Sequence, residues 1–424
     1  MGHLASRDAF RDLGRTIDGN AVRAPWSETL RSILQLLYTR EEAELVSQIP
    51  AGLSTLRRIH EVTGIGKERL LSMLGRLAEK GLVMDMEIGG APCYTVSPMI
   101  IGIFEFTMMR VDGEVDFPRA AGLFKEYMGA SDGFLRSNYG KGQKVSVMRT
   151  IPHVDALESE RHVAVLDYEK ANALVENAEG AAVGICSCRH EKMHLGEKRC
   201  DVPLEMCISL SGDAGYMVRR KLARPIGRTE VRELLARAKE MKLVLNADNV
   251  RRDVQFICTC CACCCNVLAG VRDFGYPNIL VTSRFIASCK EMLCTGCGKC
   301  VAACPIDALK AQKRETADRG GHRVPSIDTS ICFGCGVCGL ACPTHAMVLV
   351  ERKQRVLLPE NTIERVVLQS LERGTLQNFI FSNPNLASQR FLRAVVGVFL
   401  ALPPVKRLMM SEAFRSKFLA RLSA

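Results

Sequence analysis

The sequence predicts an α+β protein that is built from several domains. Helical periodicity with capping residues dominates residues 27–80, whereas short apolar runs typical of strands alternate with helices between residues 163 and 245. Cysteines gather in three segments, 186–207, 258–265 and 294–342, more densely than any core requires. A chain of 424 residues is long enough for about two to four such domains.

The N-terminal part is predicted to be helical after an arm over residues 1–23, which shows no clear period. Ser27 is placed to cap one helix, and Thr39 with Glu42 forms a capping box for the next. Two further helices, one expected to start at Ser54, are joined by a glycine turn and end in a leucine stripe.

Two short strands are expected after these helices, over residues 82–88 and 94–96, with Gly89-Gly90 between them. Helix, helix, turn, helix and hairpin over residues 27–97 resemble a winged helix-turn-helix domain, to which we assign residues 24–98. The resemblance implies contact with DNA through basic side chains, here Lys67, Arg69, Arg76 and Lys80. The alternative is a packing or dimerisation domain, because a leucine stripe is equally needed for a core.

Two bursts of cysteine mark a mixed α/β domain, which we assign to residues 99–284. The first burst holds Cys186, Cys188, Cys200 and Cys207, and the second holds Cys258, Cys260, Cys261, Cys263, Cys264 and Cys265. A helix capped by Thr229 and a strand over residues 242–245 separate the bursts and would let them meet in space. Adjacent cysteines on extended backbone point to opposite faces, so all six of the second burst cannot serve one site.

These ten cysteines exceed what packing needs, and we expect them to include metal ligands. The favoured hypothesis is an additional 4Fe-4S cluster, with residues 258–265 supplying replacement ligands or another centre. Its expected ligands are Cys186, Cys188, Cys200 and Cys207. Structural zinc and a reactive dithiol pair are the alternatives.

The most specific motif is a four-cysteine run that occurs twice within residues 285–350. Cys294, Cys297, Cys300 and Cys304 precede a proline, and the same spacing recurs 38 residues later as Cys332, Cys335, Cys338 and Cys342. Thiolates at this spacing wrap an iron–sulfur cube, and the glycines between them admit close approach of the backbone. A zinc ribbon usually has two separated cysteine pairs, and disulfide frameworks belong to short secreted chains, so both fit poorly.

The two halves, CTGCGKCVAACPIDAL and CFGCGVCGLACPTHAM, resemble a dicluster bacterial ferredoxin domain. The resemblance implies two 4Fe-4S clusters, with the last cysteine of each run reaching the opposite cube. Cluster I would take Cys294, Cys297, Cys300 and Cys342, and cluster II would take Cys332, Cys335, Cys338 and Cys304. The connector over residues 310–330 is longer than is usual in the family. Residues 160–350 together resemble multidomain iron–sulfur proteins of anaerobic bacteria.

The tail over residues 351–424 is predicted to be helical. From residue 386 to the end it has seven basic residues and one acidic residue, interleaved with apolar side chains. This composition suits peripheral contact with an anionic membrane or docking in the groove of a partner. The formal net charge is +11, and two oxidised cubes at about −2 each would leave about +7.

No signal peptide opens the sequence, so we expect a cytoplasmic protein, with peripheral membrane contact through residues 386–424 as an option. The cysteine runs predict a ferredoxin-type protein that passes single electrons to a redox partner protein or oxidoreductase complex. No acid–base or nucleophilic residue set stands out, which favours a subunit of an oxidoreductase system over a complete enzyme. The alternative function is an iron–sulfur redox-sensing transcriptional regulator that uses residues 27–97 to bind DNA.

Overall fold

The structure is a computed structural model, and it confirms the α+β class. It describes residues 8–113, 115–130, 132–140, 142–158, 169–314, 322–353 and 358–411. The chain divides into two compact units: unit 1 comprises Met1–Val145 with Ile363–Ala424, and unit 2 comprises Ser146–Thr362. The strand-like run expected at residues 163–166 lies outside the described residues.

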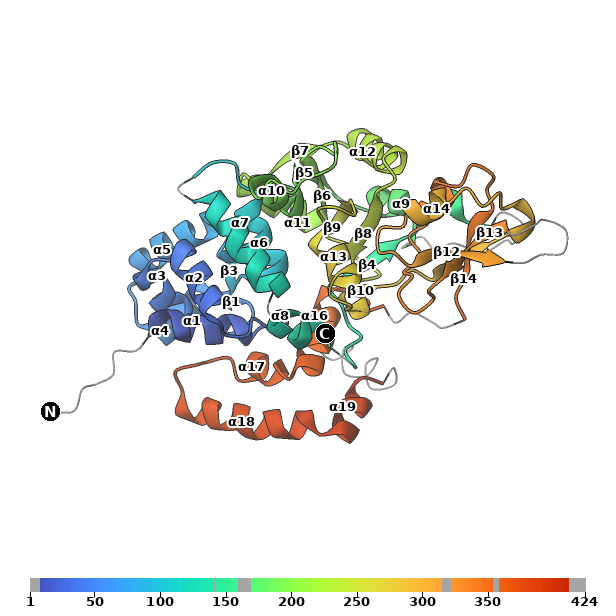
Figure 1. Ribbon diagram of the computed structural model, residues 1–424. Helices are drawn as coiled ribbons and strands as arrows, with labels where there is room; N and C mark the ends of the chain where they lie inside the picture. Colours follow the sequence, from blue (N-terminus) through green and yellow to red (C-terminus); the bar gives the residue numbers. More distant parts are fainter. Residues whose placement is uncertain are drawn as a thin grey trace. The chain divides into compact units, whose positions relative to one another are not determined.

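Unit 1 begins with the helices α1 (Ala9–Asp18), α2 (Glu28–Leu37) and α3 (Arg40–Val46) (Figure 1). Ser27 caps α2, and Thr39 with Glu42 forms the expected capping box of α3. The expected arm is wrong for α1, because Leu13 and Ile17 recur at a spacing of four and are both buried in the core.

A small antiparallel sheet packs with the next two helices. The elements are β1 (Ser54–Thr55), α4 (Leu56–Thr63), α5 (Lys67–Glu79), β2 (Val83–Ile88) and β3 (Ala91–Val96). The strand order is β1-β3-β2. Ser54 lies in β1 and does not start a helix; Thr55 caps α4 instead. In the expected leucine stripe of α5, Leu71 is exposed and the other leucines are buried.

Residues 99–145 and residues 363–424 of the C-terminal tail both belong to unit 1. Their helices are α6 (Phe104–Met108), α7 (Phe117–Lys125), α8 (Asp132–Tyr139), α16 (Thr362–Arg373), α17 (Leu376–Ile380), α18 (Ala387–Ala401) and α19 (Pro403–Met409). Buried hydrogen bonds hold α16 in this unit: Glu372 accepts from the N–H of Val145 at 3.0 Å, and Arg373 donates to the Ala21 oxygen at 2.6 Å.

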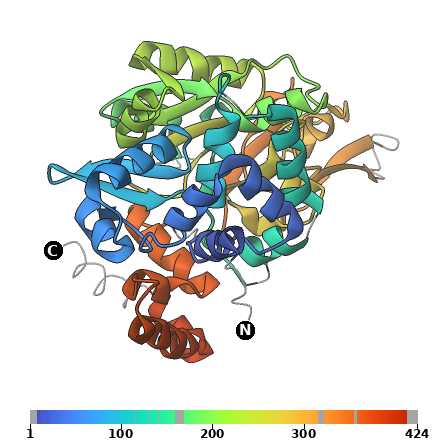
Figure 2. The same ribbon diagram turned by 90° about the vertical axis from the view of Figure 1, so that its left-hand side faces the viewer.

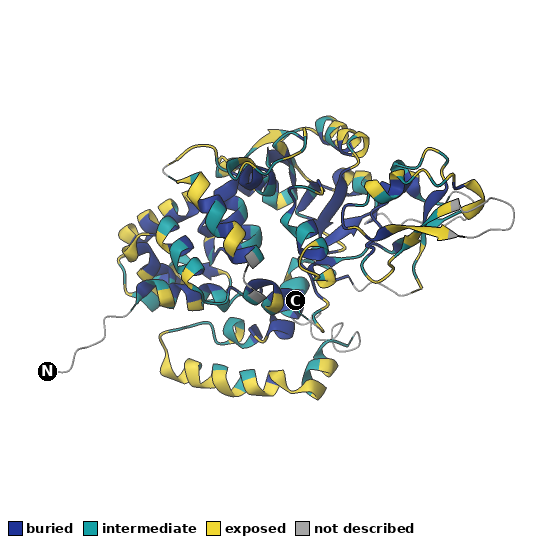
Figure 3. Cartoon of the chain, viewed as in Figure 1, coloured by how far each residue is buried: buried dark blue, intermediate teal, exposed yellow. Residues whose placement is uncertain are grey.

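The outer helix α18 exposes large apolar side chains along its length (Figure 3). The exposed residues of α18 and its flanks include Phe391, Val395, Val398, Phe399 and Leu402. No helix in the described part of the chain is long and apolar enough to cross a membrane.

Unit 2 contains a seven-stranded sheet of order β10-β4-β8-β9-β6-β5-β7, in which only β10 and β4 pair in parallel. The strands are β4 (Met148–Ile151), β5 (Ala181–Ile185), β6 (Glu205–Leu210), β7 (Ala223–Ile226), β8 (Val244–Asp248), β9 (Phe256–Cys260) and β10 (Leu280–Val281). The helices are α9 (Ala171–Glu176), α10 (Ser187–His194), α11 (Ser211–Arg219), α12 (Arg228–Glu240) and α13 (Asn266–Arg272). Gly227, and not Thr229, is the N-cap of α12.

The remainder of unit 2 is a module with two similar halves. Its elements are β11 (Phe285–Cys289), α14 (Lys299–Ala302), β12 (Leu309–Arg314), β13 (His322–Ile327), α15 (Val337–Leu340) and β14 (Met347–Glu351). Strand β11 pairs with β14, and the long connector forms the antiparallel hairpin β12–β13, which extends from the module (Figure 2).

Candidate metal centres

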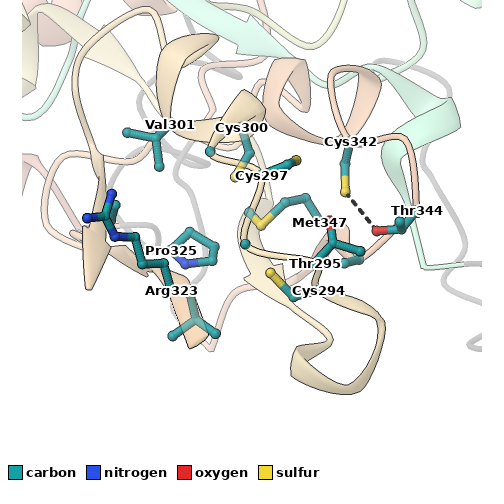
Figure 4. Close-up of a pocket in the computed structure, with 15 residues that line it drawn as sticks. Cys294, Thr295, Cys297, Cys300, Val301, Arg323, Pro325, Cys342, Thr344 and Met347 are labelled. Carbon is teal, nitrogen blue, oxygen red and sulfur yellow. Dashed lines mark hydrogen bonds between the residues drawn. The ribbon is translucent and has the colours of Figure 1, made fainter. Parts of the chain in front are cut away.

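The eight cysteines of the repeated run line two separate pockets. Pocket I contains Cys294, Cys297, Cys300 and Cys342, and pocket II contains Cys332, Cys335, Cys338 and Cys304. Each pocket therefore combines three cysteines of one run with the last cysteine of the other. Figure 4 shows the pocket I side chains, with Cys342 facing the three cysteines of the first loop from the opposite half.

Glycines in the left-handed region shape both cysteine loops. Gly296 and Gly298 have φ of 68° and 74°, and their counterparts Gly334 and Gly336 have φ of 66° and 85°. At Gly334 a Cβ atom would lie 2.0 Å from the carbonyl oxygen of Phe285, so no larger residue fits there. The second loop is thus pressed against β11 and needs glycine for steric reasons as well as for its backbone angle.

The fourth cysteine of each pocket receives hydrogen bonds from its own loop. The Ala308 N–H donates to Cys304 Sγ at 3.3 Å, and Cys342 Sγ lies 3.6 Å from Thr344 Oγ1 (Figure 4). Burial raises the pKa of Cys304. Burial also acts to raise the pKa of Cys342, but hydrogen bonds from the Met347 backbone and Thr344 outweigh it and lower that pKa. Such hydrogen bonds stabilise a thiolate ligand.

The two pockets differ in exposure. Cys297 of pocket I is exposed, whereas the three cysteines that the second run contributes to pocket II, Cys332, Cys335 and Cys338, are all buried. Next to pocket I, Met292 and Leu293 are 86% and 50% exposed, which is unusual for apolar side chains of this size. The cysteine loop of pocket I is therefore the more exposed of the two.

One arginine accompanies each pocket. Arg323 and Pro325, both from strand β13, line pocket I, so the connector hairpin forms part of its rim (Figure 4). Arg352 donates hydrogen bonds to the Cys332 and Phe285 carbonyl oxygens behind pocket II, the second at 2.8 Å. A cation beside an anionic cluster favours its more negative, reduced state.

The two cysteine bursts of the seven-stranded sheet meet because of the strand order. Strands β5 and β9 both run antiparallel to β6, which lies between them, so their carboxyl ends reach the same edge of the sheet. Cys186 directly follows β5, and the second burst begins in β9 and continues into the turn before α13. This edge collects cysteines that are up to about 80 residues apart in sequence.

Four of these ten cysteines form a compact group, which we call the Cys200 group: Cys200, Cys261, Cys263 and Cys264. Their sulfur atoms all lie within 4.8 Å of one another. Hydrogen bonding to Cys264, together with the charge of Arg189, lowers the pKa of Cys261 to about 4. A thiolate is therefore favoured within the group before any metal binds.

The other six cysteines adjoin one another in a string that we call the Cys258 string. Its order is Cys207, Cys258, Cys260, Cys265, Cys188 and Cys186. Hydrogen bonding from its neighbours in the string lowers the pKa of Cys260 to about 5. The four cysteines of the first burst, which were expected to bind one additional cluster, are therefore not brought together. Cys200 lies with three cysteines of the second burst, whereas Cys186, Cys188 and Cys207 lie in the string.

Comparison with known proteins agrees with the repeated cysteine run. Residues 293–346 match the family model of the 4Fe-4S dicluster domain. Curated proteins and solved structures gave no match. The match at residues 293–346 shows that the chain contains a dicluster ferredoxin-type domain that carries 4Fe-4S clusters, and the role of this domain is iron–sulfur electron transfer.

Proposed function

We propose that the dicluster domain passes single electrons between a low-potential donor and an oxidoreductase partner. Pocket I would hold cluster I on Cys294, Cys297, Cys300 and Cys342, and pocket II would hold cluster II on Cys332, Cys335, Cys338 and Cys304. The crossed grouping of the cysteines in the two pockets is the observation that supports this most directly. Each bound cube supplies one-electron redox chemistry, and the chain supplies ligands, amide hydrogen bonds and burial.

We further propose that the redox partner docks beside pocket I. The exposed Cys297 and the exposed apolar pair Met292 and Leu293 lie on this side of the domain. An exposed apolar patch next to a redox centre allows close approach of a partner surface. The positive net charge of the chain favours an acidic partner.

The experiment is anaerobic electron transfer from the reduced full-length protein to flavodoxin, an acidic protein acceptor, and to methyl viologen, a small acceptor. Met292→Glu should slow transfer to flavodoxin by about an order of magnitude and leave transfer to methyl viologen unchanged. Phe274→Glu, an exposed apolar position elsewhere in unit 2, is the matched control and should change neither rate. Equal rates to flavodoxin in the wild type and in Met292→Glu would remove the docking proposal.

A redox-sensing regulator is the second candidate, and the β1-β3-β2 sheet behind α4 and α5 favours it. Two of the four basic side chains expected to contact DNA are already paired: Arg69 with Glu41 at 2.5 Å and Lys80 with Glu42 at 2.8 Å. These ion pairs reduce the positive charge that the domain can offer to DNA phosphates. Duplex DNA retained by the full-length protein at low salt and released with rising salt would support regulation; no retention would remove it.

Peripheral membrane contact through residues 386–424 is proposed from the apolar face of α18. Phe391, Val395 and Val398 are each at least half exposed and follow helical spacing, with basic residues nearby. Co-sedimentation with vesicles that contain anionic lipid should fall on Phe391→Glu. Val111→Glu, an equally exposed position outside α18, is the control. Binding that is unchanged in Phe391→Glu would contradict the proposal.

A further inference from the structure

The Cys200 group has the spacing of ligands to a single ion. Cys200 Sγ lies 3.7 Å from Cys261 Sγ and 3.9 Å from Cys264 Sγ, while Cys263 Sγ lies 4.0 Å and 3.4 Å from the same two atoms. Four thiolates that bind one tetrahedral zinc ion at about 2.3 Å lie about 3.8 Å apart. The observed separations scatter around that value.

The dicluster domain shows the contrasting arrangement. A 4Fe-4S cube binds each thiolate at a different iron atom, so its four ligands lie farther apart than the four ligands of one ion. No three of the eight cysteines of pockets I and II have sulfur atoms within 4.8 Å of one another, although all eight belong to the described residues. The same chain thus has two kinds of four-cysteine site, and the Cys200 group is the compact kind.

A buried cation gives a second, independent reason to expect an anionic centre at this place. Arg189 is 1% exposed, and its Nε and Nη1 atoms have no hydrogen-bond partner among the residues that the structure describes, while Nη2 donates to the Thr259 oxygen. Within the described ranges, no carboxylate lies within ion-pair distance of Arg189; the thiols that interact with its charge are Cys186 and Cys260 of the Cys258 string and Cys261 of the Cys200 group. A buried guanidinium is costly unless negative charge balances it. Four thiolates on one divalent ion carry about −2.

Two more cations hold the backbone that carries the four cysteines. Lys198 Nζ donates to the Cys200 oxygen, and Arg272 Nη1 donates to the Ala262 oxygen at 2.8 Å. Arg189 donates in the same way to the carbonyl oxygen of Thr259, in the strand that leads to Cys261. Both segments that supply ligands therefore have a backbone carbonyl group that accepts a hydrogen bond from a positively charged side chain. These contacts fix the loop and place positive charge around the four sulfur atoms.

We propose that Cys200, Cys261, Cys263 and Cys264 hold one zinc ion in a tetrahedral structural site that is separate from the two 4Fe-4S clusters. Zinc prefers four thiolates in this geometry, and sites in which all four ligands come from protein are structural. The ion joins the loop before β6 to the turn after β9, and so closes the edge of the sheet where the two bursts meet. The buried Arg189 balances its charge.

The test is the zinc, iron and sulfide content of full-length protein purified without oxygen. The expected result is about one zinc in addition to about eight irons per chain. Cys263→Ser should lose zinc and keep iron, whereas Cys93→Ser, a buried cysteine of unit 1, should keep both. Wild-type protein without zinc would overturn the proposal whatever its iron content. Failure of the dicluster proposal would instead appear as loss of iron with zinc retained.

Alkylation of the native wild type provides a measurement that requires no variant to fold. Cys200 and Cys263 are partly accessible, so iodoacetamide should label them slowly in the zinc-loaded protein and rapidly after a zinc chelator is added. Mass spectrometry locates the labelled residues. Cys200 and Cys263 that label at the same rate before and after chelation would contradict the site.

Discussion

The backbone N–H of His153 donates a hydrogen bond of 3.0 Å to the carbonyl oxygen of Cys335 in the loop of pocket II. The ring of the same histidine lies with Nε2 2.8 Å from the Leu243 oxygen, and the next residue, Val244, pairs with Cys260 in the sheet. A short chain of hydrogen bonds therefore connects the dicluster domain to the edge of the sheet that carries the Cys258 string. The neighbouring turn, Val154–Ala156, packs on the same loop at Gly336 and on α15 at Gly339.

His153 should make the stability of unit 2 depend on pH. Burial lowers the pKa of His153 below its ordinary value of 6.5, so the ring stays neutral in the folded state at a pH at which the unfolded chain already takes up a proton. This stabilising contribution is present above pH 6.5 and is lost as the pH falls through the folded-state pKa. The thermal unfolding midpoint should therefore fall between pH 7.5 and pH 5.5, as followed by circular dichroism.

His153→Gln should reduce that fall, because the replacement does not titrate. His345→Asn is the control: His345 is exposed, and the variant should show the pH dependence of the wild type, including any shared acid lability of the clusters. An undiminished fall in His153→Gln would show that other groups cause it.

Gly334 should be far less replaceable than Gly298, although both have positive φ. The Ala side chain at Gly334 would meet the Phe285 oxygen at 2.0 Å, whereas nothing lies within 4 Å at Gly298. Gly298→Ala should cost about 1–2 kcal/mol of unfolding free energy, which is the cost of a left-handed non-glycine residue. Gly334→Ala should cost more and release the cluster of pocket II, lowering iron from about eight to about four per chain. Equal iron content in the two variants would contradict this explanation.

Arg323→Gln should lower the reduction potential of the cluster in pocket I. The guanidinium lines this pocket but is exposed to solvent, so we expect a shift on the order of tens of millivolts. Lys313→Gln removes the same charge from the paired position of the hairpin, which does not line the pocket, and should shift the potential less. Redox titration followed by low-temperature electron paramagnetic resonance measures both. A larger shift in Lys313→Gln would show that Arg323 does not act on the cluster.

The repeated cysteine spacing predicted the dicluster domain because ligand spacing along the chain is set by the cluster itself. The Cys200 group depends instead on the antiparallel pairing of β6 with β9, which brings the loop before β6 to the turn after β9, and no local pattern encodes that pairing. Cys263 and Cys264 are adjacent and were expected to point apart; the backbone turns there, between β9 and α13, so both reach one site. The part that Arg189 plays at this site could not be predicted from the sequence, because it follows from the burial of its side chain.

The helix α1 was missed for a related reason. Its apolar residues are few, and three charged residues interrupt them, so the pattern resembles a solvated arm until Leu13 and Ile17 are seen in the core. The division into units also depends on long-range contacts. Glu372 and Arg373 of α16 form buried hydrogen bonds with residues more than 200 positions earlier in the chain, and these bonds hold the tail in unit 1.

Crossed ligation of the two clusters predicts different iron contents for two double cysteine variants. Cys294→Ser with Cys342→Ser removes two ligands of one cluster and should keep about four irons per chain, like either single variant. Cys294→Ser with Cys304→Ser removes one ligand from each cluster and should leave almost none. The reverse result, about four irons for the second pair and almost none for the first, would show that each cysteine run binds its own cluster without crossing.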